Sequence, residues 1–328
     1  MPTIKILGIC DLHFGSNPDG AWTGSYPAEY RMRSTKGRRL QEAIDMGNAV
    51  SVDLALNLGD CGEYPVDVQA FVDGTINGIA GEGTETGLSC PMASVVGNWE
   101  AAHYGVGWSD YADYFADIDT EGTLQPAREN PWPSIAEPDA YTFEKNGFRF
   151  IVLFNAGSIH YVGQNPDARI YEPSPPSTQL YWLEHTALNT DLPCIILTHS
   201  HLTEAADWFV AGAWKNGYAH YGDHGEDATY LAPVRAVLEA AGNVQLVMAG
   251  HFHWGARPMI INDIPYLHLG GSSVAIDAAD GVTANRYAII EITTGQLRGV
   301  NQMRSAIKVT GYVRQPNINL HKFLGVQV

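Results

Sequence analysis

The 328-residue chain is long enough for one large domain or two ordinary ones, and because no shift in composition divides it, we expect a single domain over residues 1–328. Its 36 acidic and 19 basic side chains give a formal net charge of −17, which repels polyanions and makes long nucleic acids unfavourable partners. The sequence shows no signal-peptide pattern and no apolar run of about 18 residues, so we expect a soluble, unprocessed, cytoplasmic protein without a membrane segment. The four cysteines include no Cys-x-x-Cys pair and are expected to be buried and reduced.

The first third of the chain alternates predicted strands and helices. Runs of apolar and β-branched residues predict buried strands, and apolar residues spaced three or four apart predict helices that pack one face on a sheet. The predicted strands cover residues 3–10, 53–58 and 92–96, and the predicted helices cover 37–50 and 65–79. Since strands separated by helices usually run parallel, this part of the chain predicts an α/β fold.

Two long stretches near these elements are rich in glycine, proline and aromatic residues. Residues 14–35 are predicted to form an irregular loop over the strand ends, and residues 104–138 a surface excursion with one short helix near 109–115. We expect both stretches to border the functional site and to set its specificity, because loops at strand ends carry many of the contacts to ligands.

The second half of the sequence predicts a more antiparallel arrangement. Asn146-Gly147 is a strong hairpin signal, because both residues tolerate the positive φ angles of a tight turn, and alternating residues flank it over 140–144 and 148–155. The later predicted elements are a helix over 177–188, a strand over 194–198, a helix over 229–241, an apolar strand from Val244, two strands over 259–268 about an Asn-Asp turn, and strands over 287–293 and 307–313.

Five of the predicted strands are followed at once by residues that can bind metal ions. Because the carboxyl ends of strands in α/β sheets gather ligands at one edge, we expect these side chains to converge. Carboxylates mixed with imidazoles suit Mn, Fe or Zn better than Ca, which prefers oxygen alone. Seven donors are too many for one ion and fit two divalent ions that share a carboxylate. The candidate ligands are Asp11, His13, Asp60, Asn98, His199, His251 and His253.

A pair of ions held in this way would serve phosphoryl chemistry. Two metal ions roughly 3.5–4 Å apart lower the pKa of a bridging water and stabilise both the attacking and the leaving oxygen of an in-line displacement at phosphorus. The sequence therefore predicts a hydrolase whose substrate is a small phosphoester and whose nucleophile is a metal-bridging hydroxide.

The order of these motifs resembles that of the calcineurin-like metallophosphoesterase superfamily, over residues from about 3 to 270. The motifs are Asp11-x-His13, Gly59-Asp60, Gly97-Asn98, His199 and Gly250-His-x-His253. The connecting segments 177–199 and 141–154 look most like its class III branch, the cyclic-nucleotide and glycerophosphodiester phosphodiesterases. The resemblance implies a sandwich of two mixed β-sheets flanked by helices. We expect the C-terminal strands, about 285–328, to complete or extend the second sheet.

The resemblance also implies how the ligands divide between two ions, with Asp60 as the bridge. One ion would be held by Asp11, His13, Asp60 and His253, and the other by Asp60, Asn98, His199 and His251. Asn98 is further expected to contact the phosphate.

One position departs from the superfamily pattern, in which the third motif carries a histidine that protonates the leaving oxygen or steadies the phosphate. Here that residue is Trp99, and an indole cannot donate an acidic proton at neutral pH. Loss of a general acid typically costs ~10²–10⁴-fold in rate when the leaving group is poor. His103 and His201 are the candidates to replace it, and His220 and His224 are weaker alternatives.

These observations favour a dinuclear-metal phosphodiesterase. The alternatives are a phosphomonoesterase or nucleotide pyrophosphohydrolase of the same superfamily, and a metal-binding protein with weak hydrolytic activity because Trp99 replaces the usual histidine. The sequence makes no prediction about the oligomeric state.

Overall fold

The computed structural model describes residues 2–14, 20–21, 30–31, 36–62, 65–97, 100, 140–153, 179–203, 228–251, 258–269, 274–275, 287–296, 303–311 and 318–321. The surface excursion predicted over 104–138, with its short helix near 109–115, lies outside these residues.

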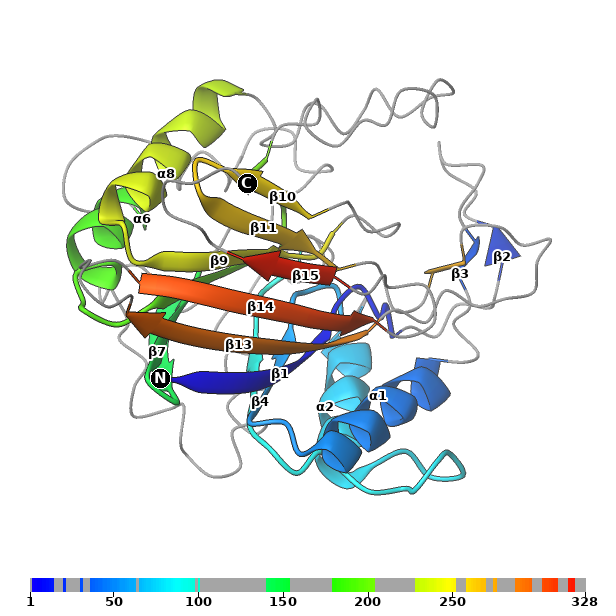
Figure 1. Cartoon of the computed structure of the whole chain (residues 1–328). Helices are drawn as coiled ribbons and strands as arrows, with labels where there is room; N and C mark the ends of the chain where they lie inside the picture. The colour runs from blue at the N-terminus through cyan, green and yellow to red at the C-terminus, as the bar shows by residue number, and fades with distance from the viewer. Residues whose placement is uncertain are drawn as a thin grey trace.

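Within the described residues, two six-stranded mixed sheets enclose an apolar core (Figure 1). The first sheet has the order β15 (Ile318–His321), β14 (Met303–Gly311), β13 (Ala288–Gln296), β1 (Thr3–Ile9), β4 (Leu54–Asn57) and β5 (Met92–Ser94). The second has the order β10 (Met259–Ile261), β11 (Ile264–His268), β9 (Val244–Ala249), β8 (Cys194–Thr198), β7 (Phe148–Val152) and β6 (Tyr141–Lys145). The predicted fold class is confirmed.

Each of the two sheets contains a run of neighbouring parallel strands. In the first sheet β1, β4 and β5 run parallel, and in the second β7, β8, β9 and β11 do so. Every second side chain of these strands enters the core between the sheets, as the period of two in a strand requires. Ile6 and Leu56 come from the first sheet and Ile195 and Met248 from the second, and all four are fully buried. The carboxyl ends of four parallel strands, β1, β4, β8 and β9, lead into the predicted ligands.

Helices flank the sheets, as predicted. Two of them, α1 (Lys36–Val50) and α2 (Pro65–Asn77), lie beside the first sheet, and α6 (Gln179–Trp182) and α8 (Ala228–Ala241) lie beside the second (Figure 1). Helix α1 packs closely on β1, since a Cβ added to Gly47 would lie 3.0 Å from the Leu7 side chain. The helix predicted over 177–188 is described from Gln179, as α6, and continues as a π-helical turn, η3 (Leu183–Ala187). No described helix combines the length and the apolar character needed to cross a membrane.

The two turns predicted from residue type are confirmed by their backbone angles. Asn146 and Gly147 connect β6 and β7 with φ angles of 50° and 78°, the left-handed values that this hairpin turn requires. Asn262 and Asp263 connect β10 and β11 with φ angles of 47° and 66°. Asparagine and aspartate adopt this conformation at a lower cost than other residues with side chains.

Three features differ from the predicted elements. Within the stretch predicted to be irregular, β2 (Gly20–Ala21) and β3 (Tyr30–Arg31) form a small sheet with β12 (Val274–Ala275). Strand β15 was not predicted. The C-terminal strands β13, β14 and β15 extend the sheet that contains β1, because β13 pairs antiparallel with that first strand.

Candidate metal centre

Five predicted ligands lie where parallel strands of the two sheets end. Asp11 and His13 follow β1, Asp60 follows β4, His199 follows β8 and His251 follows β9, and all five side chains are buried. Strands β1 and β4 are neighbours in one sheet, and β8 and β9 are neighbours in the other. Because the sheets pack face to face, the carboxyl ends of both strand pairs meet, and the predicted convergence of these five residues is observed.

The backbone at these strand ends adopts the left-handed conformation. Asp11, His13, Asp60 and His251 have φ angles of 50°, 49°, 55° and 66°. A residue with a side chain held at such angles costs of order 1–3 kcal/mol, and such residues cluster at functional sites. The conformation turns each chain sharply out of its strand. Cross-strand bonds hold the turns, with the His13 N–H donating to the Asp60 carbonyl at 2.8 Å.

Two glycines make room for the ligand side chains. A Cβ on Gly59 would lie 2.5 Å from Nδ1 of His199, and a Cβ on Gly97 would clash with the Asp60 carboxylate. Gly59 also has a φ of 97°, a conformation that side-chain-bearing residues rarely adopt. The Gly-Asp and Gly-Asn motifs therefore begin with glycine because the side chains of His199 and Asp60 approach the backbone too closely for a Cβ at either position.

The donors form two clusters, and Asp60 belongs to both. Among the described residues, the donor atoms of Asp60, His199 and His251 lie within 4.8 Å of one another, and so do those of Asp11, His13 and Asp60. Oδ2 of Asp60 lies 3.7 Å from Nε2 of His13 and 3.5 Å from Nε2 of His199. This is the arrangement expected when one carboxylate is shared by two metal ions.

The two histidines of the second cluster face each other with ring nitrogens that suit a metal ion. Nδ1 of His199 donates to the Leu58 carbonyl at 2.7 Å, which leaves Nε2 as the nitrogen with a lone pair. That Nε2 lies 3.1 Å from Nδ1 of His251. Two nitrogens bound to one ion at 2.0–2.1 Å lie about 2.9–3.4 Å apart, so the pair fits a shared divalent ion.

The charges around His199 also favour a cation. Burial lowers the pKa of the His199 imidazole, but the Asp60 and Asp11 carboxylates and the bond to Leu58 outweigh this effect and raise it to about 9. The site thus attracts positive charge strongly enough to hold a proton on a buried imidazole. A divalent cation at the same place would replace that proton, because metal ligation requires the unprotonated ring.

Glu100, just beyond β5, is a buried acid that the sequence prediction missed. Its two carboxylate oxygens accept hydrogen bonds from the backbone N–H groups of Asp60, Cys61, Gly62 and Gly97, at distances from 2.6 to 3.2 Å. Burial and the nearby Asp60 raise the pKa of Glu100 to about 7, although His199 and the backbone bonds act in the opposite direction. The sequence feature that could have identified Glu100 is its place in the third motif, where the superfamily carries Asp or Glu.

His201, predicted to replace the missing acid, lies beside His251 and His268. It is 3% exposed, and its ring centre lies 5.9 Å from that of His251 and 5.0 Å from that of the buried His268. Burial, together with the neighbouring histidines, lowers the pKa of His201 well below 6.5. The ring is therefore neutral at physiological pH, and its part in proton donation stays a prediction. His268 was assigned no function from the sequence.

Three further predicted site residues, Asn98, His103 and His253, lie outside the described residues, as does Trp99. Their predicted roles are unchanged by the described geometry. The described residues thus contain three ligands of the predicted first ion and three of the second, with Asp60 in both sets.

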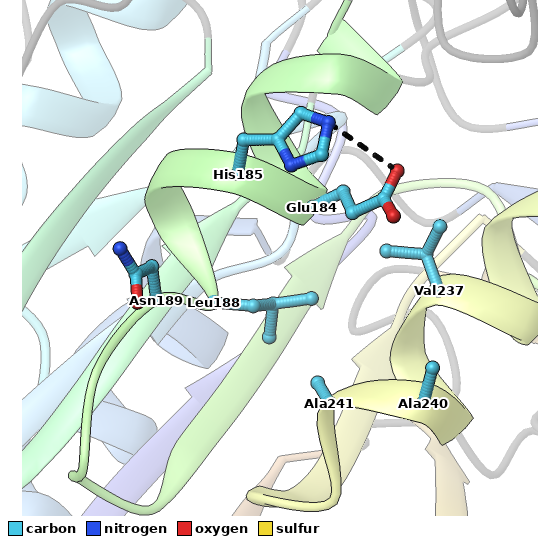
Figure 2. A pocket seen from close by; sticks show the side chains of 7 residues that line it. All are labelled: Glu184, His185, Leu188, Asn189, Val237, Ala240 and Ala241. Carbon is cyan, nitrogen blue, oxygen red and sulfur yellow. Dashed lines mark ion pairs between the residues drawn. The ribbon is translucent and has the colours of Figure 1, made fainter.

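A separate cavity of about 450 Å³ lies between η3 and α8 (Figure 2). Glu184 and His185 lie on one wall, with an ion-pair distance of 3.9 Å, and Val237, Ala240 and Ala241 lie on the other. These residues precede β8 and β9 in the chain. The cavity is therefore near the amino ends of those strands, at the edge opposite the metal ligands.

The mixed sheets and the two candidate donor clusters that share Asp60 are the features expected of a metal-dependent phosphoesterase. The chain belongs to the calcineurin-like phosphoesterase family, whose sequence pattern matches residues 4–255. The fold is similar to that of a dimetal phosphatase from Danio rerio, with 16% identity, a TM-score of 0.60, and coverage of 98% of this chain and 99% of that chain. Purple acid phosphatase PPD1 from yellow lupin (Lupinus luteus) seeds shows 13% identity and a TM-score of 0.48, over 94% of this chain and 51% of that chain. A comparison with curated proteins finds no match.

Proposed function

We propose that this protein hydrolyses a small phosphodiester with two divalent transition metal ions, Mn, Fe or Zn. The observation that carries the proposal is the position of Asp60, whose carboxylate belongs to both donor clusters. Two bound ions supply an activated water and neutralise charge on the phosphate. Imidazoles among the ligands favour transition metals over Ca or Mg.

The protein's own residues support this chemistry in defined ways. Asp60 would hold both ions, with Asp11 and His13 on one side and His199 and His251 on the other. The Leu58 carbonyl keeps the proton of His199 on Nδ1, so that Nε2 can bind. The His251 N–H donates to Oδ2 of Asp11 at 3.0 Å, which ties the end of β9 to the end of β1 across the two sheets.

The preference for a diester rests on the segments 177–199 and 141–154, which resemble the class III cyclic-nucleotide and glycerophosphodiester phosphodiesterases. A phosphomonoesterase or nucleotide pyrophosphohydrolase is the alternative within the family. A reducing, cytoplasmic setting is part of the proposal, since four cysteines in a chain of this length, with no Cys-x-x-Cys pair among them, are not the pattern of a disulfide framework.

Metal analysis and two model substrates test the proposal. Protein reconstituted with Mn or Zn should contain close to two ions per chain and should hydrolyse bis(p-nitrophenyl) phosphate faster than p-nitrophenyl phosphate. Asp60→Asn is the matched control and should be inactive on both. Faster hydrolysis of the monoester would assign the protein to the alternative class, and a chain that binds no metal would contradict the proposal.

A second candidate, a metal-binding protein with weak hydrolytic activity, is favoured by Trp99 at the motif position of the usual histidine. Two ions per chain without turnover of either substrate would support it.

A further inference from the structure

Glu100 connects the ends of two neighbouring strands, β4 and β5. Its Oε2 accepts the N–H of Asp60 at 2.9 Å and that of Gly97 at 2.8 Å, and its Oε1 accepts the N–H of Cys61 at 2.6 Å and that of Gly62 at 3.2 Å. The side chain is fully buried. One carboxylate therefore satisfies the backbone of the turn after β4 and of the turn after β5.

This carboxylate occupies a concave group of backbone N–H groups, a geometry that binds anions well in proteins. Bonds from N–H groups to an ionised carboxylate are stronger than bonds between neutral groups. The packing leaves no space for adjustment, since a Cβ on Gly97 would clash with the Glu100 carboxylate. The two turns are held at a defined distance from each other as a result.

The contact bears directly on Asp60, whose backbone is in the left-handed conformation at a φ of 55°. Its N–H bonds Glu100, and its carbonyl accepts the N–H of His13 at 2.8 Å. Both backbone groups of Asp60 are thereby fixed on opposite sides of the residue. With the backbone fixed in this way, the side chain of Asp60 extends between His13 and His199.

We infer that Glu100 is a positioning residue for Asp60: it holds the strained turn after β4 so that one carboxylate reaches both donor clusters. The inference rests on the proposed dimetal function. It assigns to Glu100 no contact with substrate or metal.

The chemistry of the contact demands a carboxylate. A glutamine at this position has the same shape but only one acceptor oxygen, and its NH₂ group would face two backbone N–H donors. An aspartate keeps both oxygens and the charge on a shorter side chain. Glu100→Gln should therefore disturb Asp60 more than Glu100→Asp does.

Electron paramagnetic resonance of the Mn(II)-reconstituted protein reads this role directly, because two ions that share a carboxylate are magnetically coupled. We expect coupled spectra from the wild type and loss of the coupling in Glu100→Gln, with an apparent Kd for Mn(II) raised by about 10- to 100-fold, the range found when an outer partner of a ligand is removed. Glu100→Asp should recover part of the coupling. Circular dichroism would establish that each variant is folded.

Glu144→Gln, an identical chemical change at a half-exposed position on β6, is the matched control and should keep the wild-type spectrum. Coupled ions with unchanged affinity in Glu100→Gln would overturn the inference. If Glu100→Gln does not fold, a Glu100→Asp protein with wild-type coupling and affinity would overturn it equally. A wild-type protein without two coupled ions would instead refute the dimetal function itself, and the role of Glu100 would be refuted with it.

Discussion

Nε2 of His199 and Nδ1 of His251 lie 3.1 Å apart, so two histidines from neighbouring strands present different ring nitrogens to one point. In His199, Nε2 is the nitrogen that faces the site because Nδ1 is bonded to the Leu58 carbonyl. His199 donates its Nδ1 proton to Leu58 across the gap between the sheets, and His251 follows β9, which is parallel to β8. The two ring planes meet at 66°, and the ring centres lie 4.9 Å apart.

This geometry predicts that the two ions can be removed separately. His199→Gln should lower the metal content from two ions per chain to about one, and His13→Gln should do the same by removing the other ion. Each change should lower kcat/KM by more than about 100-fold, because removing a ligand costs more than removing its outer hydrogen-bond partner. Asp60→Asn should bind neither ion tightly. Metal analysis together with diester hydrolysis gives the readout, and unchanged metal content in either histidine variant would contradict the assignment.

Metal removal should destabilise the protein. Asp11, Asp60 and Glu100 place three buried acidic groups close together, and bound cations would compensate their charge. A ligand present at 100 times its Kd adds about 2.7 kcal/mol to the free energy of unfolding. Thermal unfolding should therefore shift to lower temperature with a chelator and return when Mn or Zn is restored. Equal Tm values in both conditions would argue against a tight metal centre.

Gly97→Ala should damage both stability and metal binding. Its Cβ would clash with Asp60 and with Glu100, and overpacking of this kind typically costs about 1–3 kcal/mol. Gly81→Ala is a suitable comparison, because a Cβ there meets nothing within 4 Å and only the φ of 78° is unfavourable. Chemical denaturation of both variants would measure the loss of stability, and metal analysis would show whether metal binding is lost only in Gly97→Ala. Full metal content in Gly97→Ala would show that the site tolerates the added group.

His268 should make the stability depend on pH. Burial lowers the pKa of this imidazole to about 3, whereas its usual value is 6.5. Above pH 6.5 the imidazole of His268 is mostly neutral in both the folded and the unfolded state. As the pH falls below 6.5, the unfolded state takes up a proton that the folded state refuses, so about 2 kcal/mol of stability is lost between pH 8 and pH 5.

The measurement is the free energy of unfolding at several pH values, made with chelator present so that metal ligation does not contribute. His268→Leu should have a shallower dependence between pH 5 and 6.5 than the wild type, whatever its stability at pH 8. If the free energy of unfolding changes with pH by the same amount in the wild type and in His268→Leu, the prediction is refuted.

Trp99→His restores the histidine of the superfamily motif. If the natural protein lacks a general acid, the change should raise turnover of diesters with alkyl leaving groups by up to about 10²–10⁴-fold, and of nitrophenyl diesters much less, because a good leaving group needs no protonation. Steady-state kinetics on both substrate types provide the test. An equal effect on the two, or none, would count against an acid deficit.

Much of the architecture could be predicted from local patterns. The sequences of β8 and β9 are almost wholly apolar because both faces of these parallel strands are buried, and such runs are visible in the sequence. Asn146-Gly147 determines its own turn through the φ angles that the two residues tolerate. In contrast, β15 and the two-residue strands β2, β3 and β12 are too short to show a period, and they form because a partner strand is adjacent.

The candidate metal ligands could be predicted from the sequence alone, since each of them follows an apolar strand at a recognisable motif: Asp11, His13, Asp60, His199 and His251. The family resemblance already implied that Asp60 is shared, whereas the choice of ring nitrogens and the contacts of Glu100 were decided by tertiary structure. The bonds responsible join residues 40, 141 and 240 positions apart, from Asp60 to Glu100, from Leu58 to His199 and from Asp11 to His251. The first of these contacts exists only once β4 and β5 are paired, and the other two only once the two sheets are packed face to face. No local pattern of residue types encodes which buried carbonyl, amide or carboxylate a side chain will meet.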